Sequence, residues 1–398
     1  MTVADRFKPF GTTIFAEITT RAVAAKAVNL GQGFPDFDGP EFIKLAAHRA
    51  IDIKPNQYAP MGGVPELTRA IADRWKKATG QDIDPLTQVT VTAGCTEAIP
   101  ATTLGLLNPG DEAIVFEPYY DSYPASLAMA GAKPVPVTLH DKGGEFAFDE
   151  AELRAAVTPK TRAIILNTPH NPTGKVLSRL ELEQIAKVCV EHNLLCISDE
   201  VYDRLVYRDA HNSAAEHISI ASLPGMEERT ITLNSLGKTF SLTGWKIGWA
   251  IASPELTKGI RAAHQYLTYA VNTPMQHAAA EAIGAPASYY EELTKTFAQR
   301  RDALAAALER LGFKVNRPAG GYFILADHRA VSEPLGLTTD VEVCHHLIEH
   351  AGVATIPPTA FYDHKQRGEH LLRFAFCKTQ KTIDAAVERL EKLAEKVG

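Results

Sequence analysis

Short apolar runs alternate along this chain with amphipathic stretches of helical length. Five runs are apolar almost throughout and are predicted strands, at residues 89–93, 113–117, 163–167, 194–199 and 230–234. Strands that are covered by helices on both faces need such runs, whereas strands with one face in water alternate. The pattern therefore predicts an α/β fold with a mostly parallel sheet.

Two of the intervening stretches carry helix signals that do not depend on hydrophobicity alone. Residues 65–79 begin with Pro65, place Leu67, Ile71 and Trp75 on one face, and stop at Gly80. Residues 178–192 open with Ser178-x-x-Glu181, a capping box. Both stretches are predicted helices.

After about residue 280 the alternation of short apolar runs and amphipathic stretches gives way to a different order. Residues 289–311 form a long amphipathic stretch, then short apolar runs follow, and a last helix is predicted from residue 382 with Ile383, Val387 and Leu390 on its buried face. This part is expected to be a second, smaller domain.

Composition narrows the class of protein. With 398 residues, 45% hydrophobic and 22% charged, the chain has an ordinary globular composition. The net charge of −6 and the lack of a Lys/Arg-rich run argue against nucleic acid or an anionic membrane as partner, which leaves small molecules. Residues 1–9 lack the apolar core of a signal peptide, and no apolar run reaches about 18 residues, so a cytoplasmic protein is expected.

The five cysteines are scattered, mostly inside apolar runs, without Cys-x-x-Cys spacing. They are expected to be reduced core residues. His345 and His346 adjoin Cys344, but neighbouring positions on a helix point in different directions, so no metal site is expected.

The stretch from Ser235 to Gly248 carries the most specific chemistry. It places Lys238 beside a serine, several glycines and a second cation, Lys246. A lysine amine can condense with an aldehyde as a Schiff base, while Ser235 and Lys246 can hold phosphate oxygens. The cluster suits a carbonyl cofactor that bears a phosphate.

Other interpretations compete for these residues. Gly237-Lys238-Thr239 resembles the end of a P-loop, but Thr232 stands where that motif needs glycine. Ser235-x-x-Lys238 also matches the nucleophile motif of penicillin-binding enzymes, whose companion motifs are absent. A surface lysine in a turn remains the ordinary alternative for this segment alone.

Polar residues at the ends of other predicted strands strengthen the cofactor hypothesis, because ligands of parallel sheets bind at the carboxyl ends of the strands. A phosphate-bearing carbonyl cofactor built on a pyridine ring would need a carboxylate at its ring nitrogen, and Asp199 can supply it. The 3-oxygen of the ring would need hydrogen-bond donors, and the Asn171 amide and Tyr202 hydroxyl can supply them. Tyr120 suits the ring face. Taken singly, each residue also suits a cap, a turn or the core.

The phosphate is expected at a helix N-terminus. Gly94-Cys95-Thr96 leads from the strand at 89–93 into a predicted helix, and the first turn of a helix presents free N–H groups. Ser235 and Lys246 would complete this phosphate site.

With these residues in place, the chain resembles the pyridoxal-phosphate-dependent aminotransferases of fold type I, class I/II, and especially the kynurenine/glutamine/methionine aminotransferase branch. The resemblance spans almost the full length. The motifs that carry it are Asn29 to Phe37, Asn56-Gln57-Tyr58, Asn171-Pro172-Thr173-Gly174, Ser198-Asp199-Glu200-Val201-Tyr202, Ser235 to Gly248 and Arg373-Phe374.

The resemblance implies an architecture. It comprises a large pyridoxal-phosphate-binding domain at residues 44–280, with a mostly parallel seven-stranded sheet and helices on both faces. A smaller α+β domain follows at 281–398, and an N-terminal segment at 1–43 packs with it.

The resemblance also implies a role for each site residue. Lys238 is expected to form the Schiff base and to move the proton, Asp199 to contact the pyridine nitrogen, Asn171 and Tyr202 the 3-oxygen, and Tyr120 the ring. The residues expected at the phosphate are Gly94, Cys95, Thr96, Ser235, Lys246 and, from a partner subunit, Tyr58. Those expected at the substrate are Arg373 for the α-carboxylate, Gly33 through its backbone, Asn171, Phe15, Val271 and Asn272.

Two positions depart from the wider class. Many relatives have arginine where Lys246 stands, although lysine is a sound phosphate ligand. Cys95 replaces a commoner small residue, and a free thiol there raises the question of redox sensitivity.

The implied activity is transamination between an amino acid and a 2-oxo acid by a ping-pong mechanism in a homodimer with shared active sites. A cysteine-S-conjugate β-lyase on the same scaffold is the alternative, and would release pyruvate and ammonia without an oxo-acid acceptor. A non-catalytic sensor fused to a DNA-binding module is disfavoured, because no basic helix-turn-helix segment is present.

Substrate preference is predicted from an absence of charge. Residues 266–274, which the resemblance assigns to the neighbouring subunit's site, contain no arginine or lysine to pair with an acidic side chain. Phe15, Tyr58, Tyr269, Val271 and Asn272 indicate an apolar pocket instead. A large neutral amino acid of methionine, glutamine, aromatic or kynurenine type is therefore expected.

Overall fold

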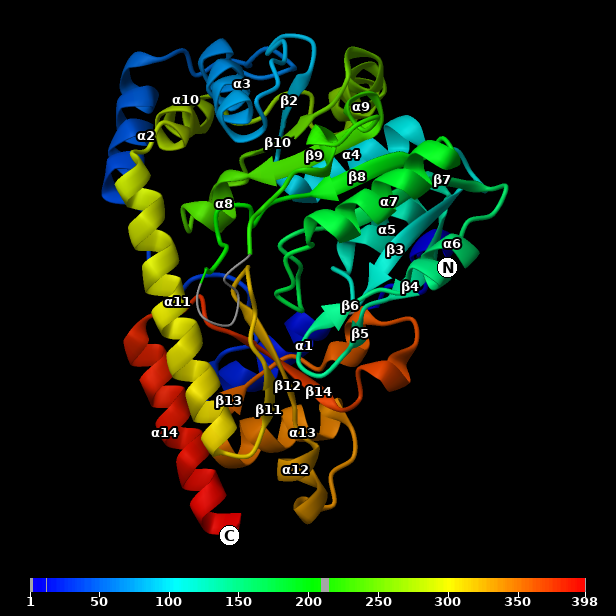
Figure 1. Ribbon diagram of the computed structural model, residues 1–398. Coiled ribbons are helices and arrows are strands. Elements are labelled where there is room, and N and C mark those ends of the chain that lie inside the picture. Colours follow the sequence, from blue (N-terminus) through cyan, green and yellow to red (C-terminus); the bar gives the residue numbers. More distant parts are fainter. Residues whose placement is uncertain (1–2, 12, 209–214, 398) are drawn as a thin grey trace.

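The computed structural model describes residues 3–11, 13–208 and 215–397. A twisted sheet with helices on both sides forms the upper part of the molecule in Figure 1, and a smaller assembly of strands and helices lies below it. The predicted α/β class and the mostly parallel seven-stranded sheet are confirmed.

The large sheet has seven strands in the order β2-β10-β9-β8-β7-β3-β4. All neighbouring pairs are parallel except those of β10, which lies antiparallel between β2 and β9. The strands are β2 Val89–Thr92, β3 Glu112–Glu117, β4 Lys133–Thr138, β7 Thr161–Asn167, β8 Leu195–Asp199, β9 Thr230–Ser235 and β10 Gly248–Ile251. The five predicted strands are thus present within two residues of their expected ends.

Helices cover both faces of this sheet, as the apolar runs predict. Alternate residues of β3 show the division, because Ile114 packs with the cluster of α7 while Val115 packs with the cluster of α4, α5 and α9. The helices of this part are α2 Glu41–Ile53, α3 Pro65–Thr79, α4 Cys95–Leu106, α5 Ser122–Ala130, α6 Glu150–Ala155, α7 Arg179–Glu191, α8 Leu236–Thr239, α9 Pro254–Leu267 and α10 Thr273–Ile283.

The residues that predicted helix ends in the sequence cap helices in the structure. α3 ends at Gly80 in the left-handed conformation, with φ +76°. At the start of α7, the Ser178 hydroxyl accepts from the Glu181 N–H while the Glu181 carboxylate accepts from the Ser178 N–H.

The smaller part has its own sheet and core. Its strands are β11 Lys314–Asn316, β12 Phe323–Asp327 and β14 Leu371–Ala375, which pair antiparallel in that order. β1 Val28–Asn29 pairs parallel with β13 Val353–Ala354. A short hairpin of β5 His140–Asp141 and β6 Phe146–Ala147 belongs instead to the large part, where Phe146 packs in the core of α7. The helices of the smaller part are α1 Ile14–Ala24, α12 Arg329–Ser332, α13 Asp340–His346 and α14 Gln380–Val397.

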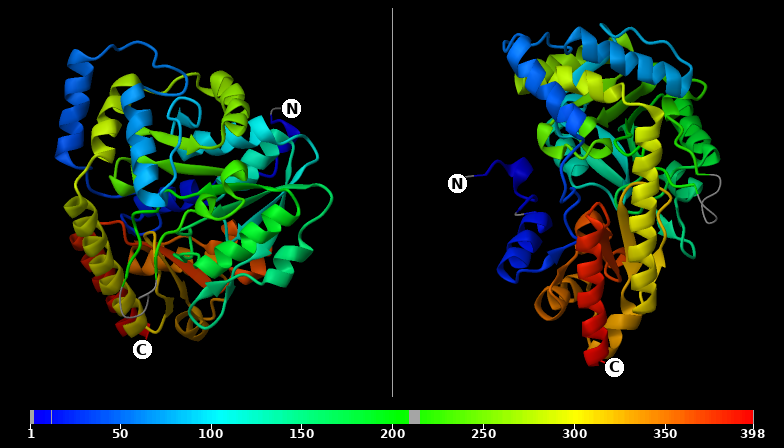
Figure 2. Two further views of the ribbon diagram at one scale, coloured as in Figure 1. Left: turned by 45° about the horizontal axis from the view of Figure 1, so that its top comes forward. Right: turned by 90° about the vertical axis from the view of Figure 1, so that its left-hand side faces the viewer.

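The long helix α11, Ala287–Arg310, connects the two parts. It runs down one side of the molecule and lies beside α14 in each view of Figures 1 and 2. Its first turn contributes Tyr289 and Tyr290 to the core of α2, α3 and α10, while Phe297 and Leu304 belong to the core of the smaller part. The domain limits at 43/44 and 280/281 stay a prediction.

None of the helices within residues 3–11, 13–208 and 215–397 combines the length and apolar composition needed to cross a bilayer.

Candidate active site

A cavity of about 330 Å³ opens at the carboxyl ends of β7, β8 and β9, beside the N-terminus of α4. Parallel strands deliver the residues that follow them to one edge of the sheet, which is where the sequence predicted the chemistry. The predicted site residues that line the cavity are Phe15, Gly33, Gly94, Cys95, Thr96, Tyr120, Asn171, Asp199, Tyr202, Ser235, Lys238, Lys246 and Arg373.

Lys238 lies on α8, a single turn that follows β9 directly. Gly237 permits the backbone of Thr243 to approach this turn closely, since a Cβ there would lie 3.1 Å from the Thr243 Cα. The Lys238 amine stands 5.7 Å from the ring centres of both Tyr202 and Tyr322. Burial lowers the pKa of this amine, against the opposing effect of nearby acidic groups that include Asp199.

Asp199 is the last residue of β8, and its carboxylate is held by two donors. The Tyr123 hydroxyl donates to Oδ2 at 2.8 Å, and the Val201 N–H donates to Oδ1 at 3.3 Å. Burial raises the pKa of Asp199 to about 6, although both hydrogen bonds and Lys238 act in the opposite direction.

The backbone of Asp199 is fixed from the neighbouring strand. The side-chain NH₂ group of Asn167 donates to the Asp199 backbone carbonyl at 2.8 Å, and the Thr168 N–H donates to the same oxygen at 3.1 Å. The side-chain oxygen of Asn167, Oδ1, in turn accepts from the Asn171 N–H at 2.7 Å. One amide thus sets the relative positions of two predicted cofactor residues.

Three further groups surround the space beside Asp199. Tyr202 is buried, and burial raises the pKa of its phenol, so that it stays protonated as a donor. Asn171 accepts from Arg373 through its oxygen at 3.2 Å, which leaves its NH₂ group as the donor for another partner. Tyr120 lines the cavity with its ring edge-on to Tyr123 at 5.7 Å.

A cradle for an anion lies at the start of α4. Gly94 precedes the helix with φ +71°, a conformation that favours glycine, and the N–H groups of Cys95 and Thr96 occupy the first turn. Lys246 donates from its amine to the Thr96 hydroxyl at 2.8 Å, and Ser235 lies beside them. Gly248 allows the close approach, because a Cβ there would lie 2.7 Å from the Gly94 Cα.

Cys95 is not a reactive thiolate. Its thiol donates to the Asn234 carbonyl at 3.2 Å, and burial raises its pKa well above the ordinary value. Redox sensitivity at this residue stays a hypothesis.

Arg373 lies on β14 and is 1% exposed. The rings of Phe15, Phe323 and Phe361 surround its guanidinium at 4.2 to 5.0 Å. Besides its bond to Asn171, it donates to the Gly31 carbonyl at 2.9 Å, while its Nε has no partner among the described residues. Burial lowers its pKa to about 10, so it remains a cation.

Comparison with known proteins shows the family of this chain. The family model for aminotransferases of class I and II matches residues 25–390. The chain belongs to the class I and II aminotransferases.

Individual aminotransferases match over nearly their whole length. A probable N-succinyldiaminopimelate aminotransferase of Mycobacterium tuberculosis is 48% identical, with 100% of this chain and 99% of the relative aligned. A solved structure of that enzyme from the same organism superposes with a TM-score of 0.94 and covers 98% of this chain and 100% of its own. Kynurenine–oxoglutarate transaminase 3 of Mus musculus is 40% identical over 97% of this chain and 89% of its own.

Aminotransferases of this class depend on pyridoxal 5′-phosphate, and the residues of the cavity fit that cofactor. The amine of Lys238 lies in the same cavity as the buried carboxylate of Asp199, which accepts a hydrogen bond from the Tyr123 hydroxyl. The helix N-terminus with Lys246 and Ser235 has the chemistry that a phosphate requires.

Three residues that were predicted to belong to the active site do not line the cavity of their own chain. Tyr58 is 84% exposed, with its ring edge-on to Tyr269 at 5.5 Å. Val271 packs in the core around α3 and α10, and the Asn272 side chain caps α10 by accepting from the Met275 N–H at 3.2 Å. Their contribution to a partner's site stays a prediction.

Sequence reasoning missed several residues of the site. Tyr123 was not singled out, although it lies three positions after Tyr120 and donates from its N–H to the Tyr120 carbonyl at 3.0 Å. Asp121 also lines the cavity, and burial raises its pKa. Phe323 could not be found, because its place beside Arg373 depends on the pairing of β12 with β14.

Proposed function

We propose that this aminotransferase moves the amino group of a large neutral amino acid to a 2-oxo acid, in a ping-pong cycle, as a homodimer with shared active sites. Methionine, glutamine, aromatic amino acids and kynurenine represent the donor class.

The cofactor-binding roles follow from the donors present. Lys238 would hold pyridoxal phosphate covalently through its amine, and Asp199 would accept the hydrogen bond of the ring nitrogen. Asn171 and Tyr202 would donate to the 3-oxygen. The N–H groups at the start of α4, with Thr96, Ser235 and Lys246, would hold the phosphate. Bound pyridoxal phosphate supplies a ring that takes up the electron pair left when the α-proton departs.

Lys238 is the group suited to move that proton. Its amine lies in the cavity, 5.7 Å from the ring centres of both Tyr202 and Tyr322, and burial lowers its pKa in the direction of the neutral form that can accept a proton from the α-carbon. Asp199, ionised and held by Tyr123, would keep the ring nitrogen protonated.

The observation that supports a neutral donor is the set of charges in the cavity. Among the described residues that line it, the lysines and arginines are Lys238, Lys246 and Arg373. Each has a role, at the cofactor, the phosphate and the α-carboxylate respectively. Asp121 adds a carboxyl group, which would repel an acidic side chain, and the aromatic residues Phe15 and Phe34 form apolar walls.

A second candidate donor carries a distal carboxylate on a long chain, as in the substrate named for the 48% identical relative. One feature favours it. Gln32 and Phe34 line both the active-site cavity and an adjoining groove that contains Lys378 and Lys381. Lys378 already donates to the Phe34 carbonyl at 2.7 Å, which leaves Lys381 as the cation for such a carboxylate.

Single-turnover rates distinguish the neutral amino donor from the donor with a distal carboxylate. The purified enzyme is mixed with methionine, glutamine, phenylalanine, kynurenine, aspartate or N-succinyldiaminopimelate, and the change in cofactor absorbance is followed by stopped flow. Lys381→Gln serves as the matched variant. Our proposal expects the neutral donors to react fastest and to be unaffected by Lys381→Gln. Aspartate outpacing methionine and phenylalanine would contradict it, and a preference for N-succinyldiaminopimelate that Lys381→Gln removes would establish the second candidate.

A further inference from the structure

Glu97 is a buried carboxylate in the first turn of α4, beside the cradle in which the phosphate is expected. Its side chain is 8% exposed, and Oε2 accepts from the Ala93 N–H, next to Gly94. A phosphate group carries a charge of about −1.5 to −2 at pH 7, and a second anion in the same helical turn repels it. A phosphate site at this turn therefore needs a group that neutralises Glu97.

His264 of α9 is the basic side chain that contacts this carboxylate. Its ring is 0% exposed, and Nδ1 lies 2.6 Å from Glu97 Oε1. Its Nε2 lies 3.1 Å from the Met61 carbonyl oxygen, which can only accept, so Nε2 carries a proton. Two acceptors do not approach to such a distance without a proton between them, so a second proton lies between Nδ1 and the carboxylate. Whichever of these two atoms holds it, the pair has no net charge.

The charge of Glu97 acts on the cradle itself. Burial lowers the pKa of the Lys246 amine, and Glu97 is among the groups that act in the opposite direction. Lys246 donates to the hydroxyl of Thr96, which directly precedes Glu97. An unpaired carboxylate at this position would therefore act on the same cation and the same helix N-terminus that are expected to hold the phosphate.

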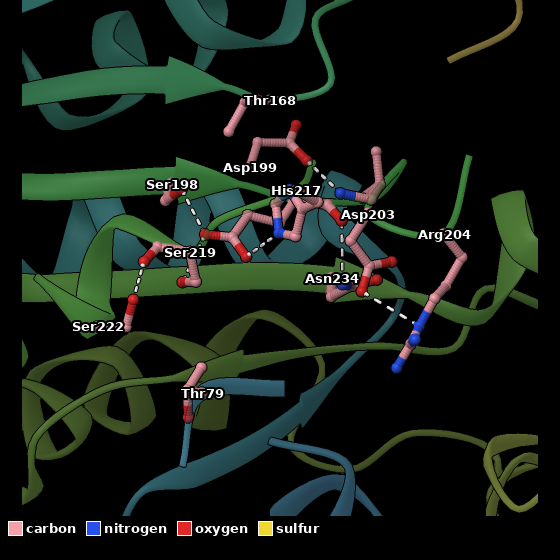
Figure 3. A network of polar contacts seen from close by, with 12 residues as sticks. Thr79, Thr168, Ser198, Asp199, Asp203, Arg204, His217, Ser219, Ser222 and Asn234 are labelled. Atoms are coloured by element: carbon pink, nitrogen blue, oxygen red, sulfur yellow. Dashed lines mark hydrogen bonds and ion pairs between the residues drawn. The ribbon is translucent and has the colours of Figure 1, made fainter. Parts of the chain in front are cut away.

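A second buried histidine–glutamate pair allows a comparison. It belongs to the network of Figure 3, where the His217 ring contacts Glu200 at 2.9 Å and the hydroxyls of Ser198 and Ser219 donate to the same carboxylate at 2.8 Å each. Glu200 directly follows Asp199, the carboxylate expected at the ring nitrogen. This pair therefore adjoins the ring end of the site, whereas the His264–Glu97 pair adjoins the phosphate end.

We propose that His264 is a positioning residue for the phosphate, because by neutralising Glu97 it allows the N-terminus of α4 to bind a doubly charged anion. The proposal rests on the place proposed above for the cofactor's phosphate. It goes further in assigning a role to two residues that do not line the cavity. Loss of the His264 ring would leave an unpaired carboxylate in the turn, and loss of Glu97 as well would remove the repulsion.

The test compares two ligands that differ only in the phosphate. Full-length protein freed of cofactor is titrated with pyridoxal 5′-phosphate and with pyridoxal, which has the same ring and aldehyde, and each Kd is measured from the absorbance of the bound form. The variants are His264→Gln, Glu97→Gln and the two combined, with His217→Gln as the matched control. Circular dichroism checks that each variant is folded.

His264→Gln should raise the Kd of pyridoxal 5′-phosphate at least about tenfold and change the Kd of pyridoxal less than about twofold. Glu97→Gln alone removes the anion and should leave both values within about twofold of the wild type. The combined variant should recover most of the affinity for pyridoxal 5′-phosphate. His217→Gln should leave the ratio of the two Kd values unchanged, because its pair adjoins the ring.

Equal weakening of both ligands by His264→Gln would overturn the proposal, because it would show a general effect on the cavity. Failure of the combined variant to recover affinity would also overturn it, as would a raised Kd of pyridoxal 5′-phosphate in Glu97→Gln, which tests the charge even if His264→Gln does not fold. Equal binding of both ligands by the wild type would contradict the phosphate site itself. The identity of the amino donor affects none of these outcomes.

Discussion

The Tyr123 phenol donates a hydrogen bond of 2.8 Å to Oδ2 of Asp199, across 76 residues of sequence. Asp199 is the buried carboxylate expected to face the cofactor's ring nitrogen, and its pKa of about 6 already lies close to neutral pH. Tyr123 is therefore a positioning residue that also keeps this carboxylate ionised.

Tyr123→Phe removes a donor that lowers the pKa of Asp199, so this pKa should rise above about 6. A bond to a charged group contributes about 1.5 to 3 kcal/mol, so its loss should raise this pKa by about 1 to 2 and lower the ionised fraction of Asp199 at pH 7, and with it kcat, by roughly two- to fifteenfold. The acid limb of the kcat against pH curve should move to higher pH. Tyr119→Phe, which removes a 2.9 Å bond to Asp363 instead, is the control and should leave the curve in place. An unmoved acid limb in Tyr123→Phe would refute this role.

The His217–Glu200 pair should make stability depend on pH. Burial opposes a charge on His217, but Glu200 and Asp203 raise its pKa above 6.5 against a smaller opposing effect of Arg74. A raised pKa in the folded state contributes stability below the unfolded value, and this contribution is lost as pH rises through the folded value. His217→Gln should lower the free energy of unfolding in urea by about 2 kcal/mol at about pH 6 and by much less at about pH 9. An equal loss at both pH values would show that the charge contributes nothing.

The shared-site dimer predicts complementation. A Lys238→Ala chain and a Tyr58→Ala chain should each be inactive, because each removes one component from both sites of its dimer. Unfolding and refolding the two together should form mixed dimers with one intact site, and about a quarter of the wild-type activity should return. Recovery is measured against each variant refolded alone. A fully active monomer in ultracentrifugation would exclude the shared site.

Much of the fold was predictable because the signals are local. Pro65 and Gly80 bound α3, and the Ser178 capping box starts α7, within the segments themselves. The strands β7, β8 and β9 were visible as apolar runs, because burial on both faces leaves no polar positions. The insertion of β10 between β2 and β9 was not, since it joins segments more than 130 residues apart.

In the candidate site, the residues at strand ends were predictable and their tertiary contacts were not. Asp199 ends β8 and Asn171 follows β7, so the parallel sheet brings them together without further information. The contacts that tune them were not visible, because Tyr123 reaches Asp199 from α5 and the rings of Phe323 and Phe361 reach Arg373 from the smaller part. Tertiary packing decides these neighbours.

The central claim is that Lys238 holds the cofactor, and the most direct measurement is borohydride reduction of the yellow holoenzyme followed by peptide mapping. Reduction fixes the cofactor to the amine that holds it, so the pyridoxyl group should be found on Lys238. Lys238→Ala treated with borohydride in the same way should carry no pyridoxyl group after gel filtration under denaturing conditions, and it should not turn over substrate. Labelling of Lys246, Lys378 or any other lysine in place of Lys238 would contradict the account.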